Sequence, residues 1–179
     1  MTSSESNHSN AVEVDGIRFE TLVPERMVRL SKYGEETPVQ FGFRITNQAS
    51  NPYRFELQRF LPELSEPHGR LMKIDGFNRN AMRRIEELDI PLIIPGASLN
   101  FLMAAKIIWY SKDCFQLLGD AIYGGSWTFY NLKPGKYQVR LKYENQLPKR
   151  KILIPPRRTE IEGFWIGQIT TPFANLRFR

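Results

Sequence analysis

The fold class follows from one stretch of eight residues, Val39-Gln40-Phe41-Gly42-Phe43-Arg44-Ile45-Thr46. Apolar side chains occupy every odd position, and polar or small residues occupy the even ones. Because successive side chains of a β-strand point to opposite faces, this alternation predicts a strand with one apolar face. Residues 47–52 are a cluster of turn formers, and the alternation resumes in Tyr53–Leu57. We therefore expect two consecutive antiparallel strands joined by a short connection.

The same alternation, less regular, marks further strands in residues 17–21, 71–74, 92–94 and 98–110. In the last of these, Leu102, Ala104 and Ile108 occupy the second face, which predicts burial on both faces. Two helical turns are expected, near residues 79–88 and 112–118, and neither is long enough to organise the fold. The sequence thus predicts an all-β fold, an antiparallel two-sheet β-sandwich of about 7–9 strands with one or two short helical turns.

The most specific pattern is Leu-x-Pro-Gly-x-Tyr-x-Val, from Leu132 to Val139. Pro134-Gly135 predicts a turn, after which apolar and polar residues alternate as far as Tyr143. The pattern resembles the tyrosine corner of immunoglobulin and fibronectin type III sandwiches. The resemblance implies that the phenol of Tyr137 hydrogen-bonds back to the preceding backbone, where a corner between sheets leaves polar groups unpaired.

The C-terminal segment agrees with this resemblance. Residues 164–172 followed by 175–178 are similar to the closing strands of bacterial sandwich domains, in which an aromatic-x-Gly stretch precedes the final edge strand. The resemblance covers roughly the last 55 residues well, and the first 110 only through alternation and turn spacing. The chain departs from antibody domains because Cys114 is its single cysteine, so that the bridge between the two sheets is missing. Fibronectin-like relatives fold without that bridge.

A chain of 179 residues is long enough for one domain with its own core. Residues 1–12 are serine-rich and polar, and we expect them to form a flexible tail before a single sandwich domain at 13–179. The first fourteen residues lack the basic start and apolar run of a secretory signal. Together with the unpaired Cys114, this predicts a cytoplasmic location.

The net charge of +6 is concentrated in one segment. Residues 146–158 contain five basic side chains and no acidic one, which leaves the rest of the chain at +1. The connection 146–163 is the longest irregular segment that we expect, and it also contains an apolar triplet that could instead form a short strand. An apolar anchor within a cationic rim gives an interface both energy and steering. The candidate partner-binding residues are Lys149, Arg150, Lys151, Ile152, Leu153, Ile154, Arg157 and Arg158.

We expect neither catalytic residues, nor a metal site, nor a cofactor. His68 lies in a turn sequence, Cys114 is interpreted as a small buried thiol, and the acidic run 86–89 lacks the glycine-centred loop that calcium prefers. Gly124-Gly125 is interpreted as a hairpin turn, since it matches no phosphate-binding motif. Three tryptophans lie in apolar strand patterns, which favours core packing over a ligand platform; they are Trp109, Trp127 and Trp165.

The sequence therefore favours a non-enzymatic binding or accessory module that docks a protein partner through its end loops, chiefly the basic segment 146–163. One alternative is a protease inhibitor that inserts loops into a cleft, which is supported by architecture alone. Another is nucleic-acid binding through the same basic segment, with Tyr143 or Phe164 nearby for stacking.

Overall fold

The computed structural model describes residues 11–78, 85–121, 124–154 and 157–179. The described chain is built from strands and two short 3-10 helices, η1 (Leu57–Arg59) and η2 (Glu87–Asp89), which confirms the all-β fold class. No helix in these ranges is long and apolar enough to cross a membrane.

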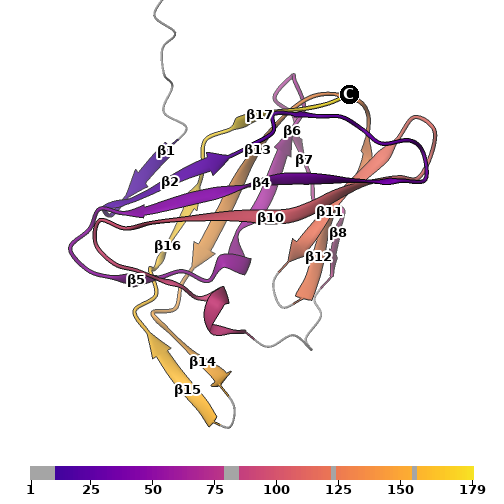
Figure 1. Ribbon diagram of the computed structural model, residues 1–179. Coiled ribbons are helices and arrows are strands. Elements are labelled where there is room, and N and C mark those ends of the chain that lie inside the picture. Colours follow the sequence, from indigo (N-terminus) through magenta and orange to yellow (C-terminus); the bar gives the residue numbers. More distant parts are fainter. Residues whose placement is uncertain (1–10, 79–84, 122–123, 155–156) are drawn as a thin grey trace, which may run out of the picture.

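Two larger sheets contain most of the strands (Figure 1). The first has seven strands, in the order β1 (Ala11–Val14), β2 (Ile17–Leu22), β4 (Glu36–Asn47), β10 (Ser98–Trp109), β11 (Phe115–Ala121), β12 (Gly125–Leu132) and β8 (Gly76–Asn78). The second has six, namely β3 (Met27–Val28), β17 (Ala174–Phe178), β13 (Gly135–Asn145), β6 (Leu61–Ser65), β7 (Leu71–Met72) and β16 (Gly167–Thr170), the last paired with β13. Two further pairs are β5 (Tyr53–Arg54) with β9 (Leu92–Ile93), and β14 (Lys149–Ile154) with β15 (Arg157–Glu162). Short edge strands thus raise the strand number above the expected about 7–9.

The stretch that predicts the fold class lies at the centre of the first sheet. β4 pairs with β10 over eleven residues and with β2 on its other side, both antiparallel. The four odd-numbered side chains are buried as expected; they are Val39, Phe41, Phe43 and Ile45. β2 follows the same rule, with Ile17, Phe19 and Thr21 buried. In both strands the period of two therefore identifies the face that enters the core.

Four details of the sequence-based topology are wrong. β5 pairs with β9 rather than with β4, because the chain enters η1 at Leu57, three residues after Arg54, and the alternation ends there. Leu102 and Ala104 are exposed, so β10 is buried on one face at these positions. Residues 115–121 form β11 instead of a helical turn, because Phe115 and Leu117 pair with β10. Ala11 and Val12, expected in the tail, belong to β1 and pair with β2.

Side chains from both larger sheets meet in one core. Phe43 of the first sheet stacks on Phe60, next to β6, and Phe115 of β11 meets Phe178 of β17 edge to face. The Thr21 hydroxyl donates to that of Thr171 at 2.7 Å, between β2 and the connection after β16. Of the three tryptophans, Trp127 and Trp165 are buried in this core as expected, whereas Trp109 is half-buried at its margin.

The chain crosses from the first sheet to the second between β12 and β13, where the tyrosine corner is expected. The Tyr137 hydroxyl donates to the Lys133 carbonyl at 2.9 Å and accepts from the Lys133 N–H at 3.1 Å. The ring is buried and contacts Phe178. The predicted phenol-to-backbone hydrogen bond is therefore confirmed, and it closes the corner between the two sheets.

Replacing Tyr137 by Phe tests the contribution of this hydrogen bond. Y137F keeps the buried ring but leaves both Lys133 backbone groups without the phenol, so we expect the free energy of unfolding to fall by about 1–2 kcal/mol. Urea denaturation measures the change. The matched control is Y130F, which removes a hydroxyl from a side chain that is 40% exposed and should change stability by less than about 0.5 kcal/mol. Equal losses in both variants would contradict the role of the corner.

Candidate functional site

The basic segment forms a β-hairpin. The expectation that residues 146–163 form an irregular loop is therefore wrong. β14 and β15 pair antiparallel from Lys149 opposite Glu162 to Ile154 opposite Arg157. The alternative of a short strand is thus the correct one, because cross-strand pairing satisfies backbone groups that a long loop would leave to solvent. The hairpin projects beyond the two larger sheets (Figure 1). Pro155 and Pro156, between its strands, lie outside the described residues.

Hydrogen bonds to β5 fix the base of the hairpin. The Arg54 N–H donates to the Gly163 carbonyl at 2.8 Å, and the Trp165 N–H donates to the Arg54 carbonyl at 3.1 Å. Between the two ends of the hairpin, the Phe164 N–H donates to the Pro148 carbonyl at 3.1 Å. The C-terminal end is therefore attached to the body by backbone hydrogen bonds, and the N-terminal end is attached to it through Phe164.

The inner face of the hairpin packs on the body. Ile152 is 3% exposed and forms a second apolar cluster with Ile90 and Phe164, against which Ile85 and Ile161 also pack. The expected exposed apolar triplet is therefore wrong for Ile152, because the pleat of β14 turns this side chain inward. Leu153 is half-buried on the opposite face, and the side chain of Ile154 lies outside the described residues. Ile152 anchors the hairpin and is not available to a partner.

Arg150 is the second inner-face anchor. Its Nε donates to Oε2 of Glu56 at 3.2 Å, and its Nη2 donates to Oδ1 of Asn145 at 3.0 Å. Arg59 of η1 reaches the same Glu56 oxygen at 2.6 Å. The Glu56 side chain is only 2% exposed, so these two guanidinium groups compensate a carboxylate that has lost its water. Arg150, expected to bind a partner, thus has a structural role at this contact.

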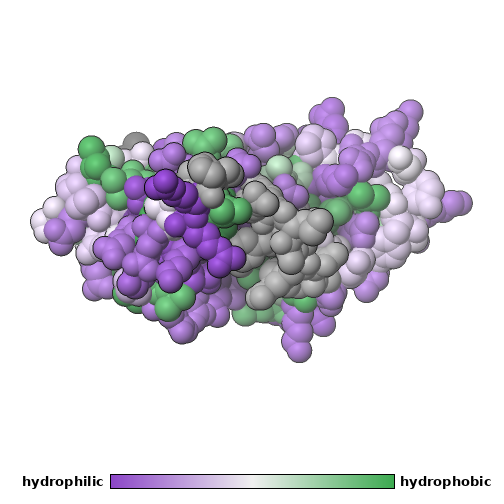
Figure 2. Space-filling view, turned by 90° about the horizontal axis from the view of Figure 1, so that it is seen from below, coloured by the Kyte–Doolittle hydropathy of each residue, from purple (hydrophilic) through white to green (hydrophobic). Residues whose placement is uncertain are grey.

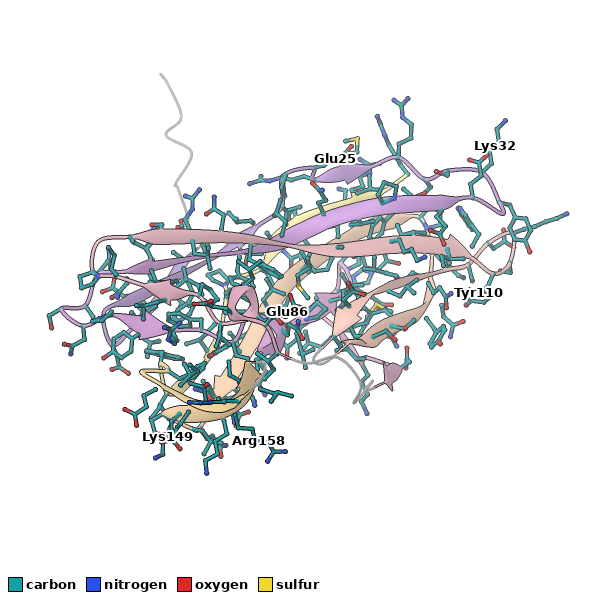
Figure 3. The ribbon with its side chains drawn as sticks, turned by 60° about the horizontal axis from the view of Figure 1, so that its bottom comes forward. Glu25, Lys32, Glu86, Tyr110, Lys149 and Arg158 are labelled. Atoms are coloured by element: carbon teal, nitrogen blue, oxygen red, sulfur yellow. The ribbon has the colours of Figure 1, made fainter. Side chains whose placement is uncertain are left out.

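The outer face of the hairpin presents three of the remaining cations, Lys149, Lys151 and Arg158. Lys149 and Glu160 form an exposed ion pair at 2.9 Å, and the hydrogen bond between them raises the pKa of Lys149 and lowers that of Glu160. Lys151 and Arg158 are exposed on this face, and Arg157, opposite Ile154, is exposed on the other face. None of the three makes an ion pair with the described residues. Figure 3 shows Lys149 and Arg158 on the hairpin, away from the two larger sheets.

A pocket lies beside the base of the hairpin, and no sequence pattern predicts it. It encloses about 450 Å³ between η1, β13 and the start of β14. Its lining combines three cations, one carboxylate, one amide and two leucines, namely Arg59, Lys142, Arg150, Glu144, Gln146, Leu61 and Leu147. These residues are separated by up to 91 positions in the sequence. Alternation places Lys142 and Glu144 on one face of β13, but only the folded chain brings Arg59 and Arg150 to them.

The aromatic side chains expected to stack on nucleobases are inside the protein. Tyr143 is fully buried and Phe164 is 3% exposed. Burial raises the pKa of Tyr143 to about 12, as is expected for a phenol in a desolvated site. Neither ring is available for stacking on a ligand at the surface.

The other sequence candidates lie apart from this region. His68 is exposed in its turn as expected, and Cys114 is half-buried rather than buried, in the connection between β10 and β11. Glu86 and Asp89 cap η2 through reciprocal hydrogen bonds. Gly124 has a positive φ of 70° and precedes Gly125 at the start of β12, which agrees with a hairpin connection, of which residues 122 and 123 lie outside the described ranges.

Replacing Arg150 by Ala tests the anchor. R150A removes a guanidinium contact from the buried Glu56 carboxylate, so we expect the free energy of unfolding to drop by about 2–4 kcal/mol. The matched control is K149A, one residue away. It removes only an exposed ion pair with Glu160, so stability should be nearly unchanged. Urea denaturation of both variants provides the comparison. An R150A variant as stable as K149A would show that Glu56 does not hold the hairpin.

Comparison with known proteins identifies no relative: no family model, no curated protein and no solved structure matches this chain. The resemblance to immunoglobulin and fibronectin type III domains therefore stays a prediction from the sequence, and the function is argued from the geometry above.

Proposed function

We propose that this protein is a non-enzymatic binding module that docks a protein partner through the outer face of the β14–β15 hairpin. The observation that carries this proposal is the division of the hairpin into two faces. The inner face is fixed to the body by Ile152 and Arg150, whereas the outer face displays cations to solvent. An arm that is already ordered loses little conformational entropy on binding, which favours affinity.

The composition of the outer face suits a polar protein surface. Lys151 and Arg158 alternate with Glu160 and Glu162, and Leu153 contributes a half-buried apolar side chain among them. Viewed from the hairpin side, the molecule shows small groups of hydrophobic residues dispersed among hydrophilic ones (Figure 2). Such a surface favours a partner recognised by charge and hydrogen bonds, with charge complementarity directing the encounter.

The backbone of the hairpin offers a second means of recognition. β14 and β15 pair only with each other among the described strands, so each has one edge without a neighbouring strand. An extended peptide can add to such an edge through main-chain hydrogen bonds. The charged side chains of the hairpin oppose its self-association through these edges.

The two alternatives are weaker. Glu160 and Glu162 lie among the hairpin cations and repel a phosphate backbone, and the rings of Tyr143 and Phe164 are buried. Protease inhibition is supported by the all-β architecture alone, with no described residue that favours it.

Removing the outward charges tests the proposed function. The triple variant K151S/R157S/R158S deletes three exposed cations and leaves both anchors intact, so the thermal midpoint should stay close to that of the unmodified protein. The measurement is affinity capture from the source cells, followed by mass spectrometry. We expect the variant to retain at least about tenfold less of the proteins that the unmodified chain captures.

The control for this experiment is K32S/K73S/K112S. It removes the same net charge from three exposed lysines outside the hairpin. Capture should be preserved in this variant, because the partner is held by the position of the charges and not by their sum. Equal loss in the two triple variants, or undiminished capture by the hairpin variant, would refute the role of the hairpin.

A further inference from the structure

The pocket at the base of the hairpin has a surplus of positive charge. Arg59, Lys142 and Arg150 contribute three cations to its lining, and Glu144 contributes the carboxylate. Glu56, behind the two guanidinium groups, brings the total to three cations against two carboxylates. Lys142 makes no ion pair with the described residues, and Glu144 is the carboxylate that shares the pocket lining with it.

Two of these cations are held in place before any ligand arrives. Arg150 is fixed by Glu56 and Asn145, and its side chain is 15% exposed. Arg59 is fixed by the same Glu56 oxygen, with 25% of its side chain exposed. Guanidinium groups immobilised in this way pay little entropy when they bind an anion, and their planar donors match the geometry of a carboxylate.

The remaining lining limits the class of ligand. Leu61 and Leu147 provide apolar contacts, and Leu147 is 49% exposed. Gln146 donates to Glu144 at 2.7 Å, so a carboxylate oxygen of the lining is already hydrogen-bonded within the protein. A ligand that carries a single carboxylate next to an aliphatic group matches this combination, whereas a polyphosphate chain would meet the Glu144 carboxylate without using the leucines.

We propose that this pocket binds a carboxylate side chain of an acidic peptide segment with an adjacent aliphatic residue. The inference rests on the proposed function, since it names the chemistry of a segment of the protein partner that the hairpin engages. Arg59, Lys142 and Arg150 receive the carboxylate, and Leu61 and Leu147 contact its aliphatic neighbour. The pocket selects the segment, and the outer face of the hairpin supplies steering.

A titration of the ¹⁵N-labelled full chain with a blocked peptide of alternating glutamate and leucine tests this assignment. We expect amide shift changes that cluster at Leu61, Lys142, Gln146 and Leu147. The same peptide with glutamine in place of glutamate should produce changes at least about tenfold weaker, because it lacks the charge. Inorganic phosphate and a single-stranded DNA oligonucleotide are the competing probes, and tighter binding of either would overturn the assignment to a peptide carboxylate.

Variants on one face of β13 separate the pocket from general charge attraction. K142E reverses a charge in the pocket and should weaken peptide binding by at least about tenfold. K136E makes the same change at an exposed lysine on the same face of the strand, outside the pocket, and should stay within about twofold of the unmodified protein. Both should keep their thermal midpoints. Equal weakening in the two variants would overturn the proposal.

The hairpin variant K151S/R157S/R158S separates this inference from the proposed function. The variant could bind the peptide in the pocket and still capture cellular proteins undiminished. That result would refute the docking role of the hairpin and support peptide binding by the pocket. The variant could instead lose cellular capture while the peptide causes no amide shift changes at Lys142 and Leu147. That result would support the docking role of the hairpin and refute peptide binding by the pocket.

Discussion

The position of the β14–β15 hairpin depends on one buried carboxylate. Glu56 lies between Arg59, on the body of the protein, and Arg150, on the hairpin, and both guanidinium groups contact the same oxygen. A carboxylate without water costs several kcal/mol unless it is paired. Lifting the hairpin away would remove Arg150 from Glu56 and expose Ile152 to water. The ion pair and the apolar contact therefore both stabilise the docked hairpin. The arm is therefore rigid because its charge balance is shared with the body.

The part of the fold that the sequence predicts is the part that depends on near neighbours. Alternation over residues 39–46 identifies the buried face of β4, since the pleat itself imposes a period of two. The Tyr137 hydroxyl hydrogen-bonds to Lys133, four residues earlier, and the turn at Pro134-Gly135 lies between them. The corner therefore follows from local chain geometry. The features that the sequence predicts, a buried face and a corner, are therefore defined by residues that are close together in the chain.

The remaining errors arise where the deciding contact is distant in the chain. Tyr53–Arg54 has the pattern of a strand, but its partner is β9, about 40 residues later, and no local signal specifies that pairing. Arg150 looks like a solvent-exposed cation until Glu56 is placed beside it, 94 residues away. Ile152 looks like an exposed anchor until Phe164 closes on it. The roles of the residues in the basic segment are therefore set by tertiary contacts that lie far apart in the sequence.

This redistribution of roles changes how the basic segment is interpreted. Counted along the chain, its five cations are compatible with a polyanion such as nucleic acid as well as with a protein partner. In the fold, Arg150 is paired with Glu56 at the body and Lys149 is paired with Glu160, so Lys151 and Arg158 are the unpaired cations of the outer face. A smaller cationic surface with carboxylates among its members is too mixed for a uniform phosphate chain and better matched to a protein surface of mixed charge. Under the proposed function, the arrangement of the charges rather than their sum directs the choice of partner.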